Sequence, residues 1–170
     1  EMLGSHDPHK YEKIKYPKIE KGNLLEISIY DLHLGKLCWH EEVGNNYDSK
    51  IAATRFNYVL SELIDRAKST PFEKILFVVG NDFFNSDNSV SQTTLGTFQH
   101  DDVRWQKMFK TGIQLLVNGI DYMRKFAPLD VVVVPGNHDM TRSFFMGETL
   151  DAWYRSDASV TVDNRANPRK

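Results

Sequence analysis

Apolar and polar residues follow two different periods along this chain, and the change between them predicts alternating strands and helices. Short apolar runs over residues 24–30, 74–79, 131–134 and 159–162 predict four strands. Apolar residues recur at helical spacing over about 50–68, 103–126 and 144–154, which predicts three helices. Asp48 or Ser49 is the expected N-cap of the first helix.

The predicted order β-α-β-α-β-α-β is typical of an α/β fold, a mostly parallel sheet with flanking helices. The runs 75–79 and 131–134 are continuous, as in strands that are buried on both faces. Residues 1–22 are polar and without a period, so we expect a flexible N-terminal segment followed by one domain over 23–170. A chain of 170 residues is long enough to bury a core in one domain.

Composition narrows the functional classes. Hydrophobic residues make up 41% and charged residues 26%, an ordinary globular balance, and the net charge of −2 provides no global basic field for nucleic acid. Cys38 is the single cysteine, which excludes an internal disulfide and favours a reducing, cytoplasmic compartment. No apolar run approaches the roughly 20 residues that span a bilayer, so we expect no membrane partner.

Three polar motifs each follow a predicted strand directly. In an open α/β sheet, ligands bind beyond the carboxyl ends of the strands, so three such loops can meet at one place. Each motif supplies carboxylate, amide or imidazole groups. The motifs are Asp31-Leu32-His33, Gly80-Asn81-Asp82 and Gly136-Asn137-His138-Asp139.

The first two motifs supply metal-ligand chemistry but are ambiguous individually. In an extended strand end, Asp31 and His33 would point to the same side and could grip one ion together. Gly80 allows a sharp turn, after which the two oxygens of Asp82 could bridge two cations. An isolated Asp-x-His is more often structural or a chance occurrence than a metal site, and an Asp after Gly is common in helix caps and Asx-turns. Asn85 could hydrogen-bond nearby or order the loop.

The third motif is the most specific of the three. Asn137 offers a neutral amide oxygen, and His138 has an ordinary pKa near neutrality, which suits proton donation to a leaving oxygen. Asp139 could orient the His138 ring and favour its charged form. The structural alternative is a turn that carries a surface histidine.

Taken together and in order, the three motifs resemble the signature of calcineurin-like metallophosphoesterases over roughly residues 24–140. The resemblance implies the first half of an α/β/β/α sandwich. It also implies that Asp31 and His33 bind one metal, that Asp82 bridges two, and that Asn137 binds the second. His138 would be catalytic and Asp139 would support it. The implied cofactors are two divalent ions, of which Mn, Fe or Zn suit the mixed ligands best.

The implied activity is hydrolysis of a phosphomonoester or phosphodiester by a hydroxide activated between two metals. A DNA exonuclease or phosphodiesterase is one candidate, with nucleic acid as the partner. No histidine follows His138, whereas the family supplies more there. We therefore expect the domain to be incomplete at its C-terminus, with weak or absent metal binding and little activity of its own. The alternative is a non-catalytic binding module that lacks the last metal ligands.

Other residues admit two interpretations each. His40 and His100 lie in predicted loops and could substitute for missing ligands. The polar loop 83–102 is either a substrate lid or a mobile surface loop. Trp105 is expected in the core, and Arg142 could contact phosphate or form a surface salt bridge. Neither the substrate nor the oligomeric state follows from the sequence.

Overall fold

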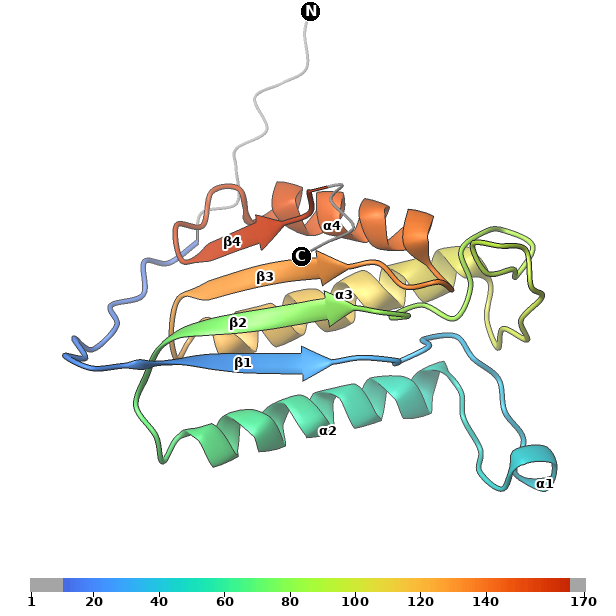
Figure 1. Ribbon diagram of the computed structural model, residues 1–170, viewed down its shortest axis with the longest axis horizontal. Helices are drawn as coiled ribbons and strands as arrows, with labels where there is room; N and C mark the ends of the chain where they lie inside the picture. Colours follow the sequence, from blue (N-terminus) through green and yellow to red (C-terminus); the bar gives the residue numbers. More distant parts are fainter. Residues whose placement is uncertain (1–10, 166–170) are drawn as a thin grey trace, which may run out of the picture.

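The computed structural model describes residues 11–165 of the chain, and these form a four-stranded sheet with helices between the strands (Figure 1). The sheet is entirely parallel, with the strand order β1-β2-β3-β4. The prediction of an α/β fold with a mostly parallel sheet is confirmed. The elements are β1 (Asn23–Ile29), α1 (His40–Val43), α2 (Ser49–Ala67), β2 (Phe72–Gly80), α3 (Trp105–Met123), β3 (Leu129–Val134), α4 (Met140–Tyr154) and β4 (Val160–Asp163).

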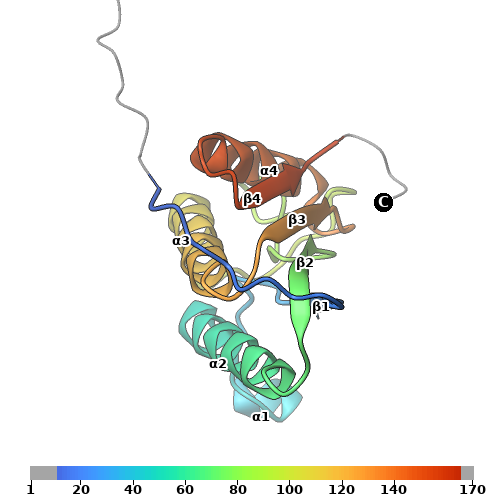
Figure 2. The same cartoon turned by 90° about the vertical axis from the view of Figure 1, so that its left-hand side faces the viewer.

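The strand order explains where the helices lie. Each strand pairs with the next one along the chain, and right-handed crossovers between such neighbours place successive helices on the same face of the sheet. Figure 2 shows α2 and α3 on one side of the sheet, and α4 packs beside α3 against β3 and β4. Alternate strand residues that point toward these helices form the core. They include Ile27, Ile75, Phe77, Val79, Val131, Val133 and Val160.

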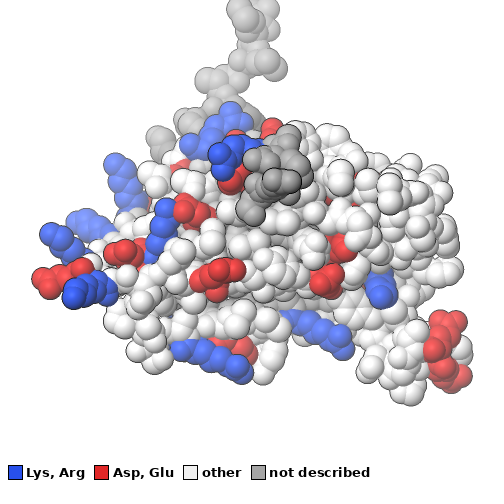
Figure 3. Space-filling view, in the orientation of Figure 1, with Lys and Arg blue, Asp and Glu red and all other residues white. Residues whose placement is uncertain are grey.

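The opposite face of the sheet carries no helix among residues 11–165. Leu76 and Val132 point to this face and are only half-buried, and Leu24 there is 58% exposed. The interpretation of both continuous apolar runs as strands buried on two faces is therefore wrong at Leu76 and Val132, although Val78 on the same face is buried. Figure 3 views this face: Lys and Arg side chains gather at its left, near the starts of the strands, and acidic side chains lie over α1.

Two helix boundaries show the difference between local and distant capping. The Oδ1 of Asp48 accepts a hydrogen bond from the Ile51 amide at 2.7 Å, so α2 has one of its two predicted caps. Helix α4 begins four residues before its predicted start at 144. The carboxylate of Asp87 accepts hydrogen bonds from the amides of Thr141 and Arg142 at 3.2 and 2.7 Å, and thereby caps the helix from a remote loop.

The expected flexible segment, residues 1–22, falls partly outside the described residues. Within the described part, the Tyr11 hydroxyl donates to the Trp153 carbonyl at 3.0 Å and the Tyr16 hydroxyl to the Arg124 carbonyl at 2.7 Å. The division into 1–22 and 23–170 stays a prediction. No helix within residues 11–165 combines the length and apolarity needed to cross a membrane.

Gly80 ends β2 in a conformation that a larger residue cannot share. Its φ is +121°, and a Cβ there would lie 2.0 Å from the Val134 carbonyl oxygen. Gly44 also has a positive φ, of +80°, but no atom lies within 4 Å of such a Cβ. We predict that Gly44→Ala lowers the free energy of unfolding by about 1 kcal/mol from left-handed strain alone. Gly80→Ala should lower it by about 3 kcal/mol or more, because the backbone must also move.

Urea denaturation of both variants measures this difference. Equal losses for the two glycines would show that the close approach of β2 and β3 at Gly80 does not constrain the fold.

Candidate metal centre

The loops after β1 and β2 run side by side beyond the sheet. The amides of Asp31, His33 and Leu34 donate to the carbonyls of Asn81, Asp82 and Phe83 at 3.0, 3.0 and 2.8 Å. This short ladder continues the pairing of β1 with β2 past the strand ends. It therefore brings the first two motifs into contact at the carboxyl edge of the sheet.

The backbone of this ladder is unusual. Four of its residues have positive φ without being glycine, namely Asp31 at 53°, His33 at 44°, Asn81 at 45° and Asp82 at 67°. Few non-glycine residues adopt this left-handed region, although Asn, Asp and His do so more often than others. The expectation that Asp31 and His33 lie on an extended strand end is wrong, although their side chains do meet.

Asp31, His33 and Asp82 form a group that could hold a metal ion. One ligand atom from each lies within 4.8 Å of the others. Nε2 of His33 is 3.7 Å from Oδ1 of Asp31, which is too long for a hydrogen bond. Two ligands about 2.1 Å from one ion lie at most about 4.2 Å apart, so the group needs only a small contraction. The Asp31 side chain is 64% exposed and has room to move.

Asp82 is held in place by the loop after β3. It is buried, and its Oδ1 accepts a hydrogen bond from the His138 amide at 2.7 Å. Gly136 passes directly against it, since a Cβ at that position would lie 2.1 Å from the same oxygen. The third motif therefore needs a glycine so that its backbone can reach the carboxylate of the second.

The His138 ring is oriented by a backbone carbonyl. Its Nδ1 lies 2.9 Å from the Asn85 carbonyl oxygen, and because a carbonyl only accepts, Nδ1 carries the proton. Nε2 is then the atom left to take up or release a proton. The ring lies edge-on to the His33 ring, with centroids 4.6 Å apart. His138 thus adjoins the candidate metal group.

Asp139 has a different role from the one expected. Its two oxygens accept hydrogen bonds from the amides of Phe84 and Gly136, at 2.8 and 3.2 Å, and its side chain is fully buried. Asn85, not Asp139, holds the His138 ring, so the predicted orienting role is corrected. Burial raises the pKa of Asp139 to about 6; the hydrogen bonds from both amides oppose this rise, and the Asp82 charge adds to it.

The remaining predicted ligands are less well placed. Asn137 is exposed, and its backbone carbonyl accepts a hydrogen bond from the Thr94 amide at 3.2 Å. Its assignment to a second metal stays a prediction. Neither His40 nor His100 belongs to the candidate group, and the His100 ring packs against Phe98 with centroids 5.1 Å apart.

The sequence did not predict that the start of the 83–102 loop is buried and held by side-chain hydrogen bonds. Phe83, Phe84, Asn85 and Ser86 are all buried. The side chains of Asn85 and Ser86 donate to the two oxygens of Asp101, at 2.8 and 2.6 Å. This part of the loop is therefore neither a lid nor a mobile surface. The available signal was the Phe-Phe pair inside an otherwise polar stretch.

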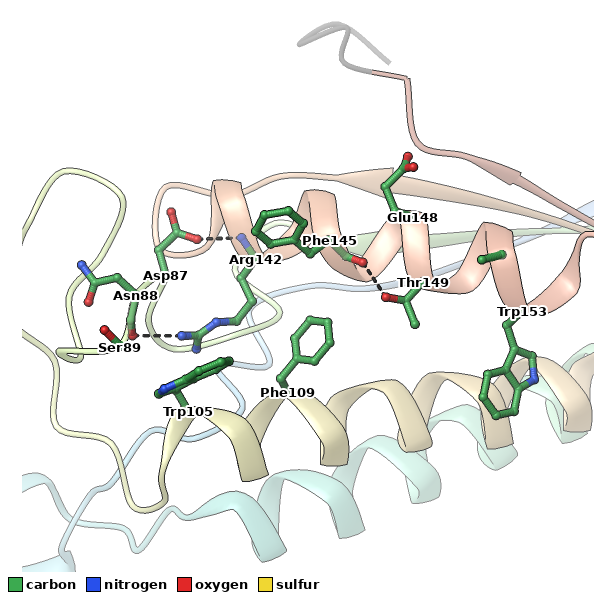
Figure 4. A pocket seen from close by; sticks show the side chains of 11 residues that line it. Asp87, Asn88, Ser89, Trp105, Phe109, Arg142, Phe145, Glu148, Thr149 and Trp153 are labelled. Atoms are coloured by element: carbon green, nitrogen blue, oxygen red, sulfur yellow. Dashed lines mark hydrogen bonds between the residues drawn. The ribbon is translucent and has the colours of Figure 1, made fainter. Parts of the chain in front are cut away.

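Arg142 and Trp105 also differ from expectation. The guanidinium of Arg142 is buried and donates to the Asn88 carbonyl at 3.0 Å, so it is not part of a surface salt bridge, and its contact with phosphate stays a prediction. Trp105 is 42% exposed instead of lying in the core. It lines an aromatic groove of about 860 Å³ between α3 and α4, together with Phe109, Phe145 and Trp153 (Figure 4).

Comparison of the chain with protein-family models, with curated proteins and with solved structures finds no significant match in any of the three.

The buried carboxylate of Asp139 provides a test of how this edge is held together. Asp139→Asn keeps the shape but turns one acceptor oxygen into a donor, which faces the amide of Phe84 or Gly136. A buried donor without an acceptor costs about 1–3 kcal/mol, so we predict a loss of about 2 kcal/mol in unfolding free energy at neutral pH. Urea denaturation measures it.

Asp151→Asn is the matched control, because Asp151 is an exposed carboxylate on α4, the helix that directly follows Asp139. It should leave stability unchanged. Equal stability of both variants would mean that Asp139 does not hold the two loops.

Proposed function

We propose that this chain belongs to a metal-dependent phosphoesterase whose reacting edge is formed by the loops after β1, β2 and β3. The observation that carries the proposal is the meeting of Asp31, His33 and Asp82 beside the His138 ring. Ligand-type side chains from three separate motifs lie at the carboxyl edge of a parallel sheet, where α/β proteins bind their ligands.

The donor set fits a transition metal. Two carboxylates and one imidazole suit Mn, Fe or Zn better than Ca, which prefers oxygen ligands alone. Nε2 of His33, which lies 3.7 Å from Oδ1 of Asp31, is the ring nitrogen that would bind the ion. The first ion would be held by Asp31, His33 and Asp82. The second would share Asp82 and take Asn137.

When bound, the ions would polarise a phosphoryl group and lower the pKa of water toward about 7, which provides a nucleophile at neutral pH. The residues of the chain position the site and transfer the proton. Asp82 is held in position, because its Oδ1 accepts a hydrogen bond from the partly buried His138 amide. Nε2 of His138 supplies a proton to the departing oxygen, while the Asn85 carbonyl keeps the ring in position.

A second candidate function is a non-catalytic module that binds one metal ion. It is favoured by the unequal ligand sets, since only Asp82 and the exposed Asn137 are available for a second ion among residues 11–165. The substrate stays at the level of a phosphomonoester or phosphodiester, with nucleic acid as one candidate. A cytoplasmic location stays a prediction from the single cysteine.

Metal binding is the first test. We predict that the chain binds Mn²⁺ and that Asp82→Asn weakens the affinity more than about tenfold, because it removes a charged ligand but keeps an acceptor for the His138 amide. Isothermal titration calorimetry measures the affinity. Asp151→Asn is the control for loss of one negative charge and should bind as the parent does. Absence of any Mn²⁺ binding would overturn the proposal.

The proton-donating role of His138 makes a separate prediction. p-Nitrophenolate leaves without needing a proton, whereas a sugar alkoxide needs one. His138→Gln should therefore slow Mn²⁺-dependent hydrolysis of dithymidine phosphate by about 10²–10⁴-fold. It should slow hydrolysis of thymidine 5′-p-nitrophenyl phosphate far less. Product formation is followed by chromatography at saturating Mn²⁺.

Two results would contradict this role. An equal slowing of both esters would indicate that His138 acts on the site in another way. Unchanged rates for both would remove His138 from the reaction, while leaving the metal site itself untouched.

A further inference from the structure

A second cavity opens directly beside the candidate metal group. It has a volume of about 350 Å³, which falls within the range of small-ligand sites. Asp31 and His33 line it, so a ligand bound to an ion at these residues would reach into this cavity. The aromatic groove between α3 and α4 shares no lining residue with it.

Two cationic side chains line this cavity without forming an ion pair to a carboxylate of residues 11–165. Lys36 follows the first motif closely, and Arg55 projects from α2. Both residues are exposed, and no ion pair joins either of them to a carboxylate within residues 11–165. The one carboxylate in the lining is Asp31, which belongs to the metal group. The rest of the cavity therefore has an excess of positive charge.

The positions of these cations are supported by packing. The Arg55 guanidinium lies 5.4 Å from the centroid of the Tyr47 ring, and the Tyr47 hydroxyl donates to the Leu32 carbonyl. Leu32 is the middle residue of the first motif, so this chain of contacts links Arg55 to the metal group. The Lys36 amide donates to the His33 carbonyl at 2.9 Å, which ties the second cation to the same turn.

The cavity also offers a surface for an uncharged ring. Its floor is apolar and includes the buried Phe56, and Tyr30 beside it is 45% exposed. Asn45 and Asn46 add amide groups that can donate or accept hydrogen bonds. A ligand that fits this lining combines a ring with polar edges and an anion.

We propose that this cavity is a subsite for the ester arm of the substrate, and that Lys36 and Arg55 bind a second anionic group beyond the phosphate at the metal. This inference rests on the proposed function for the position of the first phosphate. It defines the substrate class as a phosphate ester that carries another phosphate on a ring-bearing arm. A nucleotide chain and a phosphorylated sugar share this chemistry.

Binding of two probes tests the subsite. Thymidine 3′,5′-bisphosphate presents two phosphates and a base, whereas thymidine 5′-monophosphate presents one phosphate. With Mn²⁺ and about 50 mM salt, where exposed charges are weakly screened, the bisphosphate should bind about tenfold more tightly. In the Lys36→Gln/Arg55→Gln double variant this ratio should fall to about one. Calorimetry measures all four affinities.

Two further variants control for a general loss of positive charge and for loss of packing. Lys50→Gln removes an exposed cation of α2 outside the cavity and should keep the tenfold ratio. Arg55→Lys keeps the positive charge and should keep most of the tenfold ratio. This variant therefore separates loss of the cation from loss of the packing on Tyr47. A ratio unchanged in the double variant would overturn the subsite.

The same titrations distinguish this inference from the proposed function. In EDTA the bisphosphate should still bind more weakly to the double variant than to the parent, so the subsite can be tested without any metal. Mn²⁺ binding with no bisphosphate preference would overturn the subsite alone. Fructose 1,6-bisphosphate, which lacks a base, identifies the source of the anion. If it too binds about tenfold more tightly than a sugar monophosphate does, the result supports a sugar phosphate. If only the thymidine bisphosphate shows this increase in affinity, the result supports a nucleotide chain.

Discussion

The arrangement of the carboxyl edge depends on one buried carboxylate. Asp139 joins the loop after β2 to the loop after β3 by accepting hydrogen bonds from the amides of Phe84 and Gly136. Hydrogen bonds to a charged group contribute more than neutral ones, and here they offset part of the cost of burying the charge, so that the pKa of Asp139 still lies above its usual range. Because these loops are held together, the His138 amide reaches Asp82, and the Asn85 carbonyl reaches the His138 ring.

The sheet determines what surrounds this edge. With the order β1-β2-β3-β4 and helices on one face, every strand ends at the same side of the molecule. β1 has no neighbour beyond it within residues 11–165, so the cavity that contains Lys36 and Arg55 can open next to the first motif. The aromatic groove lies elsewhere, between α3 and α4, and Asp87 and Asn88 of the loop after β2 line it.

The four strands, the three long helices and the meeting of the first two motifs could be predicted from the sequence, because each depends on local periodicity and on the common direction of parallel strands. The start of α4 could not, since its capping residue, Asp87, is 55 residues from Arg142 along the chain. Trp105 was expected in the core because helical spacing alone does not show where a neighbouring helix stops covering it. The support of His138 by Asn85 depends on a backbone carbonyl, which no side-chain pattern reveals.

The left-handed residues of the first two motifs have a consequence for how this site can change. Each such conformation costs on the order of 1–3 kcal/mol for a side chain with a Cβ, and glycine avoids the cost. At Asp31, His33 and Asp82, glycine would therefore give the least strained backbone, but glycine has no side chain that can bind a metal. Glycine substitutions at these positions would stabilise the backbone and remove the candidate ligands, so the stability of the fold and the proposed ion binding make opposite demands on this short stretch of chain.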